Sequence, residues 1–197
     1  VVLCSATIPD LTGIINEGDV HPIRGLNKVE PILGNAETLA KTLCRTTLAP
    51  RISIAMRELA ERLAQEEQVL CIVNTRSKCL DLFDRVRALR GGENTRHLSA
   101  LMCPADRRRT LEEIRKKVAE GAPIAVVATS VVEAGVDLDF HTVWRELAGL
   151  DSIAQAAGRC NREGRRETGT VQVFEFTDEA LKSPPSFLGR SIASTLH

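Results

Sequence analysis

Aromatic residues are scarce in this chain. Only 3% of its 197 residues are aromatic, and tyrosine is absent. Proteins that hold single-stranded nucleic acid by its bases stack those bases on aromatic side chains, so the composition excludes an extensive stacking platform. Any nucleic-acid binding should therefore depend on phosphate contacts. Its affinity should be sensitive to salt and nearly independent of base sequence.

The sequence also lacks the patterns of a metal site. Its six cysteines include no C-x-x-C pair, and its four histidines are isolated from one another. Structural zinc sites need closely spaced ligands of these kinds, so we expect no metal site in this chain. Cysteines inside apolar strand-like runs, such as Cys4 and Cys71, fit a reducing cytoplasm.

No long apolar run is present either. Nothing in the chain resembles a signal peptide or a membrane-spanning segment, so we expect a cytoplasmic protein with no membrane partner. Lysine plus arginine equals aspartate plus glutamate, at 26 each, so the net charge argues neither for nor against nucleic acid. Basic residues do cluster at 107–109 and 159–166, where they could contact phosphates or form solvated helix faces.

The chain does contain a regular alternation of apolar strands and amphipathic helices from residue 51 onward. Hydrophobic residues make up 43% of the sequence, enough for one domain with a real core. The periodicity predicts strands over residues 69–73, 97–101, 124–128, 143–144 and 170–176, and helices over 51–66, 77–89, 104–120 and about 152–162. This alternation predicts an α/β fold with a mainly parallel sheet flanked by helices.

The two ends of the chain are expected to differ from this regular part. Residues 1–4 form an apolar strand that begins without a polar lead-in, and we interpret the chain as the C-terminal part of a longer protein. Residues 8–50 carry many prolines and glycines, which predicts a partly structured connector with a helix from about Ala36 to Arg45. Residues 178–197, rich in Ser, Pro and Gly, are predicted to be a linker or tail.

Small polar residues follow several of the predicted strands. In an open parallel sheet, ligands bind at the carboxyl ends of the strands. Hydroxyl groups there can bind a phosphate without reading a base. For the stretch at residues 5–7 taken alone, a strand-end cap is the alternative. The candidates at these positions are Ser5, Ala6, Thr7, Asn74, Thr75, Arg76, Ser99 and Thr129.

A pair of arginines follows the last predicted helix. The stretch Gln155-Ala-Ala-Gly-Arg-Cys-Asn-Arg162 places Arg159 and Arg162 three positions apart. On a helix they would share one face and reach one anion together, and their guanidinium groups suit the charge of a transferring phosphoryl group. Gly158 would let backbone or ligand approach closely beside Arg159. The alternative is a solvated basic helix end.

The segment over residues 128–139 is a second candidate for nucleotide binding. Gly135 permits a tight backbone turn. Asp137 could accept hydrogen bonds from a ribose hydroxyl, as acidic residues do in other nucleotide-binding folds. Two alternatives stay open for Asp137 and Asp139. Their carboxylates could be solvated in a turn, or they could form a pair of Mg²⁺ ligands.

Four short motifs thus stand in order along the chain, at residues 5–7 (Ser-Ala-Thr), 72–75 (Ile-Val-Asn-Thr), 129–137 (Thr-Ser-Val-Val-Glu-Ala-Gly-Val-Asp) and 155–162. The ordered set resembles motifs III, IV, V and VI of superfamily 2 helicases. The sequences of residues 97–107, 132–140 and 150–164 are more family-specific, and resemble the CRISPR-associated helicase-nuclease of type I systems. The resemblance covers roughly residues 1–177.

The resemblance implies a second RecA-like helicase lobe over residues 51–177, preceded at 1–7 by the last strand and motif III of the first lobe. ATP with Mg²⁺ would lie between the lobes, with the Mg²⁺ held by the first lobe. The implied arginine fingers and motif VI glutamine are Arg159, Arg162 and Gln155, and the implied ATP-binding positions are Gly135, Asp137 and Gly158. The implied coupling motif is Ser5, Ala6 and Thr7, and the residues assigned to single-stranded DNA are Asn74, Thr75, Arg76, Ser99 and Thr129.

The expected function is that of an ATP-dependent 3′-to-5′ DNA helicase or translocase that serves a nuclease in type I CRISPR interference. Its expected partners are single-stranded DNA, the first lobe and nuclease domain of the same protein, and an RNA-guided surveillance complex. Because the sequence has no G-x-x-x-x-G-K-[ST] and no D-E-x-H motif, this chain alone should hydrolyse little ATP. Another superfamily 2 RNA or DNA motor or restriction translocase, and a non-catalytic nucleic-acid-binding module, are the alternatives.

Overall fold

The computed structural model describes residues 14–15, 23–26, 30, 36–133 and 135–178. Contacts divide the chain into two units, Val1–Cys44 and Arg45–His197. The strand expected at 1–4, the candidates Ser5, Ala6 and Thr7, and the tail from residue 179 lie outside the described residues. Within the described ranges, no helix has both the length and the apolar character needed to cross a membrane.

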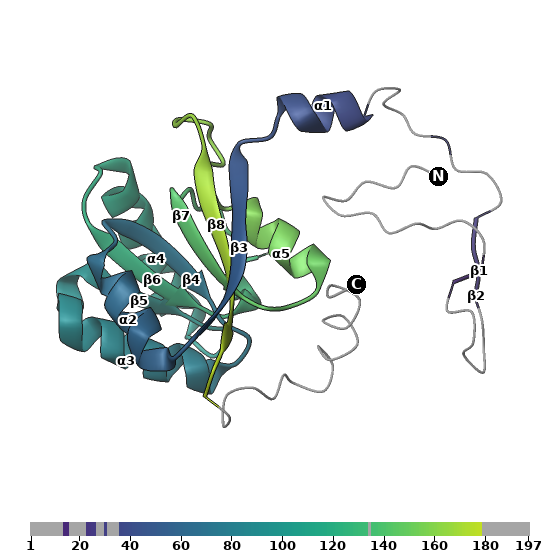
Figure 1. Cartoon of the computed structure of the whole chain (residues 1–197). Coiled ribbons are helices and arrows are strands. Elements are labelled where there is room, and N and C mark those ends of the chain that lie inside the picture. Colours follow the sequence, from purple (N-terminus) through teal and green to yellow (C-terminus); the bar gives the residue numbers. More distant parts are fainter. Residues whose placement is uncertain (1–13, 16–22, 27–29, 31–35, 134, 179–197) are drawn as a thin grey trace. The chain divides into compact units, whose positions relative to one another are not determined.

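In the first unit, the described elements are two short strands and a helix (Figure 1). Strand β1 (Ile14–Ile15) pairs antiparallel with β2 (Ile23–Arg24). Helix α1 (Ala36–Thr42) confirms the helix expected there, although it ends three residues before the predicted Arg45.

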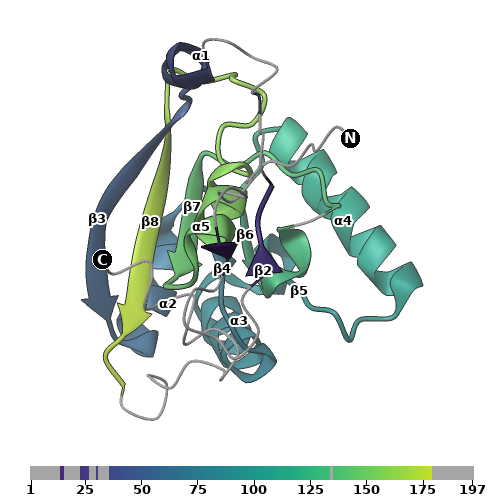
Figure 2. The same cartoon turned by 90° about the vertical axis from the view of Figure 1, so that its right-hand side faces the viewer.

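In the second unit, six parallel strands form one sheet, which confirms the predicted parallel α/β architecture. In chain order they are β3 (Thr46–Ile54), β4 (Gln68–Ile72), β5 (Thr95–Leu98), β6 (Ile124–Ala128), β7 (Thr142–Glu146) and β8 (Gly169–Phe176). Their order across the sheet is β3-β8-β7-β4-β6-β5. Figures 1 and 2 show β3 alongside β8 at one edge.

Helices cover both faces of this sheet, because alternate strand residues point to opposite sides. Side chains from α2 (Met56–Gln65) and α3 (Arg76–Arg90) pack into a core on one face. Side chains from α4 (Pro104–Ala119) and α5 (Leu150–Ala157) pack into a second core on the other. The 3₁₀ turns η1 (Gly92–Asn94) and η2 (Ser130–Val132) follow α3 and β6.

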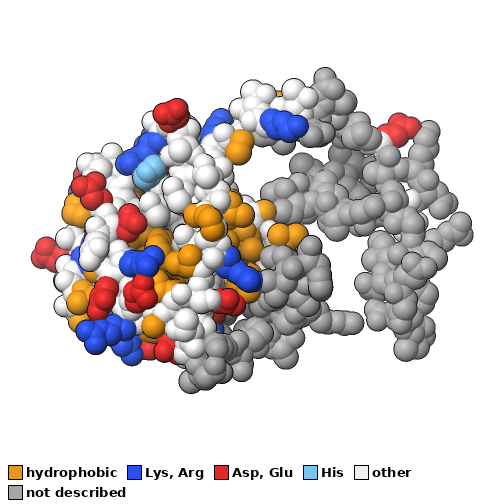
Figure 3. Space-filling model, in the orientation of Figure 1, with side chains coloured by type: hydrophobic (Ala, Val, Ile, Leu, Met, Phe, Trp, Pro, Cys, Tyr) orange, Lys and Arg blue, Asp and Glu red, His pale blue; other side chains and the backbone are white. Residues whose placement is uncertain are grey.

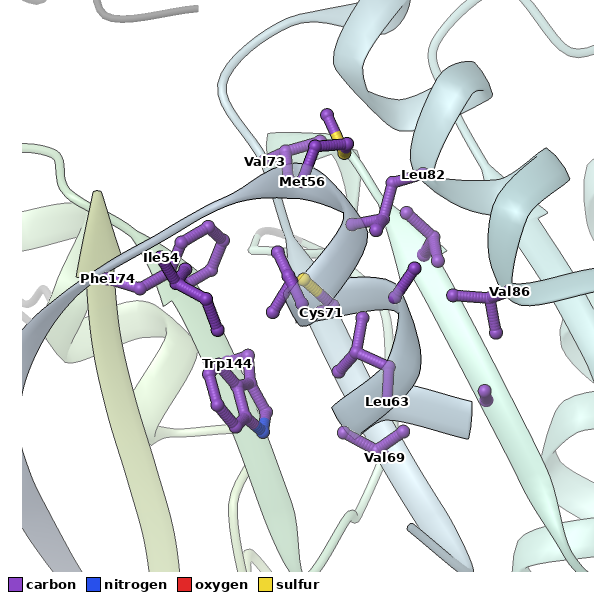
Figure 4. Packing of buried hydrophobic residues seen from close by; sticks show 14 of the residues in the cluster. Ile54, Met56, Leu63, Val69, Cys71, Val73, Leu82, Val86, Trp144 and Phe174 are labelled. Carbon is purple, nitrogen blue, oxygen red and sulfur yellow. The ribbon is translucent and has the colours of Figure 1, made fainter. Parts of the chain in front are cut away.

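The core under α2 and α3 is built around the middle of the sheet. Cys71 on β4 is fully buried there, and Figure 4 shows it between Trp144 of β7 and Leu82 of α3. The rings of Trp144 and Phe174 lie 6.0 Å apart, and Ile54 lies beside Phe174 (Figure 4). Packing of this kind fixes where the ends of β4, β6 and β7 lie, and the candidate residues follow those ends.

Strand β3 corrects the sequence-based prediction of a helix from residue 51. Residues 46–54 are extended, and α2 begins only at Met56. The strand is an edge strand that contains Pro50, and its pairing with β8 shifts register between Ala49 and Ile52. Proline lacks the N–H that a central strand needs, so edges and irregular registers are where it is tolerated.

Candidate functional site

The residues predicted to contact DNA lie at the carboxyl ends of neighbouring strands, as expected. Asn74, Thr75 and Arg76 follow β4, while Ser99 follows β5 and Thr129 follows β6. Because β4, β6 and β5 are adjacent in the sheet, the structure places these positions side by side where the strands end. We call this carboxyl end of the sheet the DNA edge. Arg76 is exposed, whereas Ser99 and Thr129 are 8% and 7% exposed.

Thr75 and Asn74 already have partners within the protein. The Thr75 hydroxyl accepts a hydrogen bond from the Lys78 amide at 3.3 Å and caps the first turn of α3. The Asn74 side chain donates to the Leu147 carbonyl at 2.9 Å and accepts from Arg145 Nη1 at 2.7 Å. The side-chain amide of Asn74 is therefore engaged at both its oxygen and its nitrogen.

The arginine pair lies elsewhere in the lobe. The Arg159 carbonyl accepts a hydrogen bond from the Phe140 amide, and Cys160 forms a parallel bridge with Phe140, two residues before β7 begins. The Gly169 amide, at the start of β8, donates to the Arg45 carbonyl just before β3. The loop over residues 159–166 thus lies at the amino ends of these strands, opposite the predicted DNA edge.

The expectation that Arg159 and Arg162 share one helix face is wrong. Helix α5 ends at Ala157, and Asn161 adopts a left-handed conformation with φ of 46°, so the two arginines stand on an irregular loop. The helix also begins earlier than the predicted residue 152, at Leu150 after Gly149, and it has no side-chain cap. A Cβ at Gly158 would lie 3.3 Å from the Gln155 carbonyl oxygen, so the close approach there is to backbone.

Arg159 points into the lobe and is only 8% exposed. Its Nε donates to the Val132 carbonyl at 2.9 Å and its Nη2 to the Glu133 carbonyl at 2.6 Å. Burial, aided by the nearby charge of Arg162, lowers the pKa of the Arg159 guanidinium from its ordinary value. Arg159 therefore ties the arginine loop to the segment that follows β6.

Arg162 lies at the surface, with 45% of its side chain exposed. Its Nε lies 3.1 Å from Asp137 Oδ1, so the structure brings these two predicted nucleotide contacts together. Its amide donates to Asp139 Oδ1 at 2.7 Å. Gly135 stands two residues before Asp137 at φ of 68°, a backbone conformation that favours glycine, and Gln155 is half-buried on α5.

Asn161 was missed as a functional candidate, although it stands between the two arginines. It is 3% exposed, and its Nδ2 donates to the carbonyls of Arg45 at 3.1 Å and Arg166 at 2.8 Å. Its Oδ1 accepts from the Arg166 amide at 3.2 Å. This side chain therefore organises the whole turn that presents Arg162.

Two buried ion pairs at the end of β7 were also missed. Lys78 Nζ lies 2.5 Å from Glu146 Oε1, with side chains 5% and 7% exposed. Arg145 Nε lies 2.9 Å from Glu133 Oε1, with side chains 2% and 8% exposed. The available signal was the charged dipeptide Arg145-Glu146 at the end of an apolar strand, because buried charges need partners.

Burial shifts the pKa values of the Arg145–Glu133 pair in opposite directions. It raises the pKa of the Glu133 carboxyl, although the Arg145 charge opposes this rise. It lowers the pKa of Arg145, and the charges of Glu133 and Glu146 oppose that change. Within the described part of the chain, no group of three or more His, Cys, Asp or Glu residues could hold a metal ion.

Surface charge on the lobe is mixed. On the face drawn in Figure 3, basic and acidic side chains of the described residues are interspersed, without a broad surface of one sign. Recognition of an anionic ligand on this face would therefore depend on individual side chains.

Curated relatives match part of the chain. The CRISPR-associated nuclease/helicase Cas3 of Haloferax volcanii is 41% identical over 92 residues, which cover 42% of this chain and 10% of that protein. The Cas3 of Methanothermobacter thermautotrophicus is 27% identical over 115 residues, covering 57% of this chain and 14% of that protein. The chain thus spans only a small part of the length of these relatives.

Solved structures show the same fold. Crystalline T. fusca Cas3 with AMPPNP superposes with a TM-score of 0.57 at 19% identity, covering 78% of this chain and 20% of that one. The E. coli DEAD-box protein SrmB superposes with a TM-score of 0.51 at 23% identity, covering 70% of this chain and 83% of that one. The second unit therefore has the α/β fold of a RecA-like lobe, as predicted.

Residues 65–165 match the family described as CRISPR-associated nuclease/helicase Cas3, C-terminal. The matched span runs from the end of α2 into the arginine loop, and it includes both buried ion pairs at the end of β7. Since this match covers half of the chain, the protein belongs to the C-terminal family of the CRISPR-associated nuclease/helicase Cas3.

Proposed function

We propose that this chain forms the second RecA-like lobe of an ATP-dependent superfamily 2 DNA helicase that works with a nuclease in type I CRISPR interference. Family membership supports the proposal, and so do the structures of relatives. T. fusca Cas3 was crystallised with AMPPNP and with ATP, and the helicase MrfA was crystallised with DNA and AMPPNP. The cytoplasm is the proposed place of action.

The observation that carries the proposal is the placement of Arg162. Its guanidinium is half-exposed on a loop whose backbone is fixed by Asn161 and Asp139. A rigidly mounted, solvent-facing guanidinium fits the γ-phosphate of a nucleotide bound to another lobe. Asp137, 64% exposed beside it, offers an acceptor for ribose hydroxyls. The donor set thus fits the nucleotide, with the Mg²⁺ held by the first lobe.

Arg159 and Arg162 would then have different tasks. In the described arrangement, both Nε and Nη2 of Arg159 donate to backbone carbonyls, so it holds the loop while Arg162 faces outward. Gln155, half-buried on α5 one turn earlier, would link the nucleotide to the first lobe. Gly158 keeps the turn between helix and loop tight, because a side chain there would press on the Gln155 carbonyl.

Single-stranded DNA would run along the opposite edge of the sheet, over Thr75, Arg76, Ser99 and Thr129. These residues offer hydroxyls and one exposed guanidinium, which suit phosphates rather than bases. The remaining proposed partners are the first lobe and nuclease domain of the same protein, and an RNA-guided surveillance complex. Ser5, Ala6 and Thr7 are proposed to couple the two lobes.

The decisive experiment replaces Arg162 by alanine in the full-length protein. Loss of an arginine finger should lower ATP turnover by roughly 10³-fold or more, while ATP binding, measured by fluorescence titration, stays close to wild type. Arg166→Ala is the matched control, because Arg166 contributes its backbone to the same loop and its alanine variant keeps those contacts. We expect near-normal turnover from this control.

Wild-type turnover in Arg162→Ala would refute the finger assignment. Separate assays with single-stranded DNA and single-stranded RNA as stimulants distinguish the DNA helicase from another superfamily 2 motor. Stimulation by RNA alone would contradict the proposed substrate. Binding of DNA by a full-length protein without any turnover would identify a non-catalytic module.

A further inference from the structure

A chain of buried polar contacts joins the two functional edges of this lobe. We propose that Arg145 is a positioning residue that couples two loops. One is the loop after β4 (residues 73–75, the DNA-facing loop), which it reaches through Asn74. The other is the arginine loop (residues 159–166), which it reaches through Glu133. This inference rests on the proposed function. Arg145 is the largest fully buried side chain among the described residues, at 1% exposed.

The first link joins Arg145 to the DNA-facing loop. Its Nη1 donates to Asn74 Oδ1 at 2.7 Å and to the Glu146 carbonyl at 2.7 Å. Asn74 stands directly before Thr75, the residue that caps α3. Any displacement of this loop by a bound strand would therefore move the Asn74 amide that the Arg145 guanidinium holds.

The second link joins Arg145 to Glu133. The two atoms Arg145 Nε and Glu133 Oε1 lie 2.9 Å apart as an ion pair. Neither atom has an aligned hydrogen-bond partner among the described residues. The link between these two side chains is therefore mainly electrostatic, between opposite charges in a buried environment.

The third link reaches the arginine loop. The Glu133 carbonyl accepts the hydrogen bond from Arg159 Nη2 at 2.6 Å, and the preceding Val132 carbonyl accepts from Arg159 Nε. Arg162 follows Arg159 by three residues. A shift of the Glu133 backbone would therefore change where the loop places the Arg162 guanidinium.

On the other face of the sheet, a second pair provides a fixed support. Glu146 accepts hydrogen bonds from the Asn74 amide at 2.6 Å and from Lys78 Nζ at 2.5 Å. Because Lys78 belongs to α3, this pair connects the start of the DNA-facing loop to α3. Glu146 therefore holds the Asn74 backbone, while Arg145 holds the Asn74 side chain.

Physical chemistry favours coupling over simple stabilisation for the Arg145–Glu133 pair. Replacing a buried ion pair by uncharged groups of similar volume is often neutral for stability, so stability alone gives little reason for it. A buried charge that loses its partner is penalised heavily. Arg145 and Glu133 must therefore move together when either end of the chain of contacts moves.

The test uses the full-length protein and the double variant Arg145→Met, Glu133→Gln. Removing both charges leaves no unpaired ion in the core and keeps similar volumes, so folding should be retained. The measured quantity is the ratio of DNA-stimulated to basal ATP turnover. We expect this ratio to fall about fivefold or more, while the Kd for single-stranded DNA stays near the wild-type value.

Val86→Ala is the matched control for loss of stability. Val86 is fully buried on α3, so its truncation weakens the core without touching the network. The coupling proposal expects Val86→Ala to keep the wild-type ratio, even where its melting temperature falls as far as that of the double variant.

A wild-type ratio in the double variant would overturn the coupling, and so would an equal loss in Val86→Ala. These results differ from a failure of the proposed function. If turnover of the wild-type protein does not respond to DNA, both proposals are refuted together. If the wild type responds and the double variant responds equally, only the coupling is refuted.

Discussion

Asn161 shows how much of the arginine loop depends on a single side chain. It combines a left-handed backbone with a buried amide that makes three hydrogen bonds to main-chain groups. Asparagine tolerates this backbone region better than most residues. The same residue therefore fixes both the turn and the distance between its two ends.

We predict that Asn161→Ala destabilises the lobe by about 2–4 kcal/mol, since it combines lost hydrogen bonds to buried groups with left-handed strain. Asn161→Gly removes the hydrogen bonds but permits the backbone, so its loss should be smaller. Urea denaturation of the 197-residue chain measures both. Equal losses for the two variants would contradict a role for the backbone conformation.

Arg159 and Arg162 show what residue types alone leave undetermined. Their pairing in one motif was evident from the sequence, but nothing in the pattern indicates that one is 8% exposed and the other half-exposed. The difference arises from the end of α5 at Ala157 and the turn at Asn161. Side-chain direction after a helix end depends on backbone angles that spacing does not reveal.

At the scale of elements, the core between helix α3 and the sheet contains two buried thiols. Cys71 is fully buried on β4, and Cys79 on α3 directs its Sγ toward the Val127 carbonyl at 3.5 Å. Burial raises the pKa of Cys79 from its ordinary value of 9.0 to about 12, and raises that of Cys71 as well. Both thiols are held protonated in the folded lobe.

The burial of these thiols predicts a loss of folding stability at alkaline pH. The unfolded chain releases the thiol protons near pH 9, while the folded lobe retains the Cys79 proton up to about pH 12, so the stabilisation is complete below pH 9 and is lost as pH rises through that window. Cys79→Ala should flatten the decline in free energy of unfolding above pH 9. The exposed Cys103 supplies the control, Cys103→Ala, which should decline like wild type.

Elements with strong periodicity could be predicted from the sequence, and β3 could not. The run over residues 124–128 became β6 without change, because five consecutive apolar residues indicate a strand covered on both faces. Residues 46–54 alternate poorly and contain Pro50, and their partner is a strand more than a hundred residues away. The buried pairs were missed for a related reason, since a charge in a sequence carries no sign of its distant partner.

At the scale of the whole molecule, the second unit should fold without the first. All three hydrophobic clusters of the described residues fall between Ile54 and Phe176. A fragment of residues 45–178 should therefore melt within about 2 °C of the 197-residue chain, a difference worth less than about 1 kcal/mol at this size.

Differential scanning calorimetry of the two chains, with the urea m-value as a second measure, provides the comparison. A fragment that melts far below the full chain, or with a reduced m-value, would show that residues before 45 or after 178 contribute to the core. A truncation that begins after Ile54, and so removes β3, is the positive control for loss of cooperative unfolding.

The pairing of β3 with β8 also determines how long β3 lacks its partner strand during synthesis on the ribosome. Ser53 and its neighbour Glu175 on β8 lie 122 residues apart in the chain. At ordinary translation rates, β3 therefore emerges on the order of ten seconds before its partner. During that interval its Leu48, which stays 61% exposed even in the folded lobe, belongs to a nascent strand with both edges open. Pro50 interrupts the row of amide donors that another chain would need, and so protects the growing polypeptide from pairing with the wrong strand.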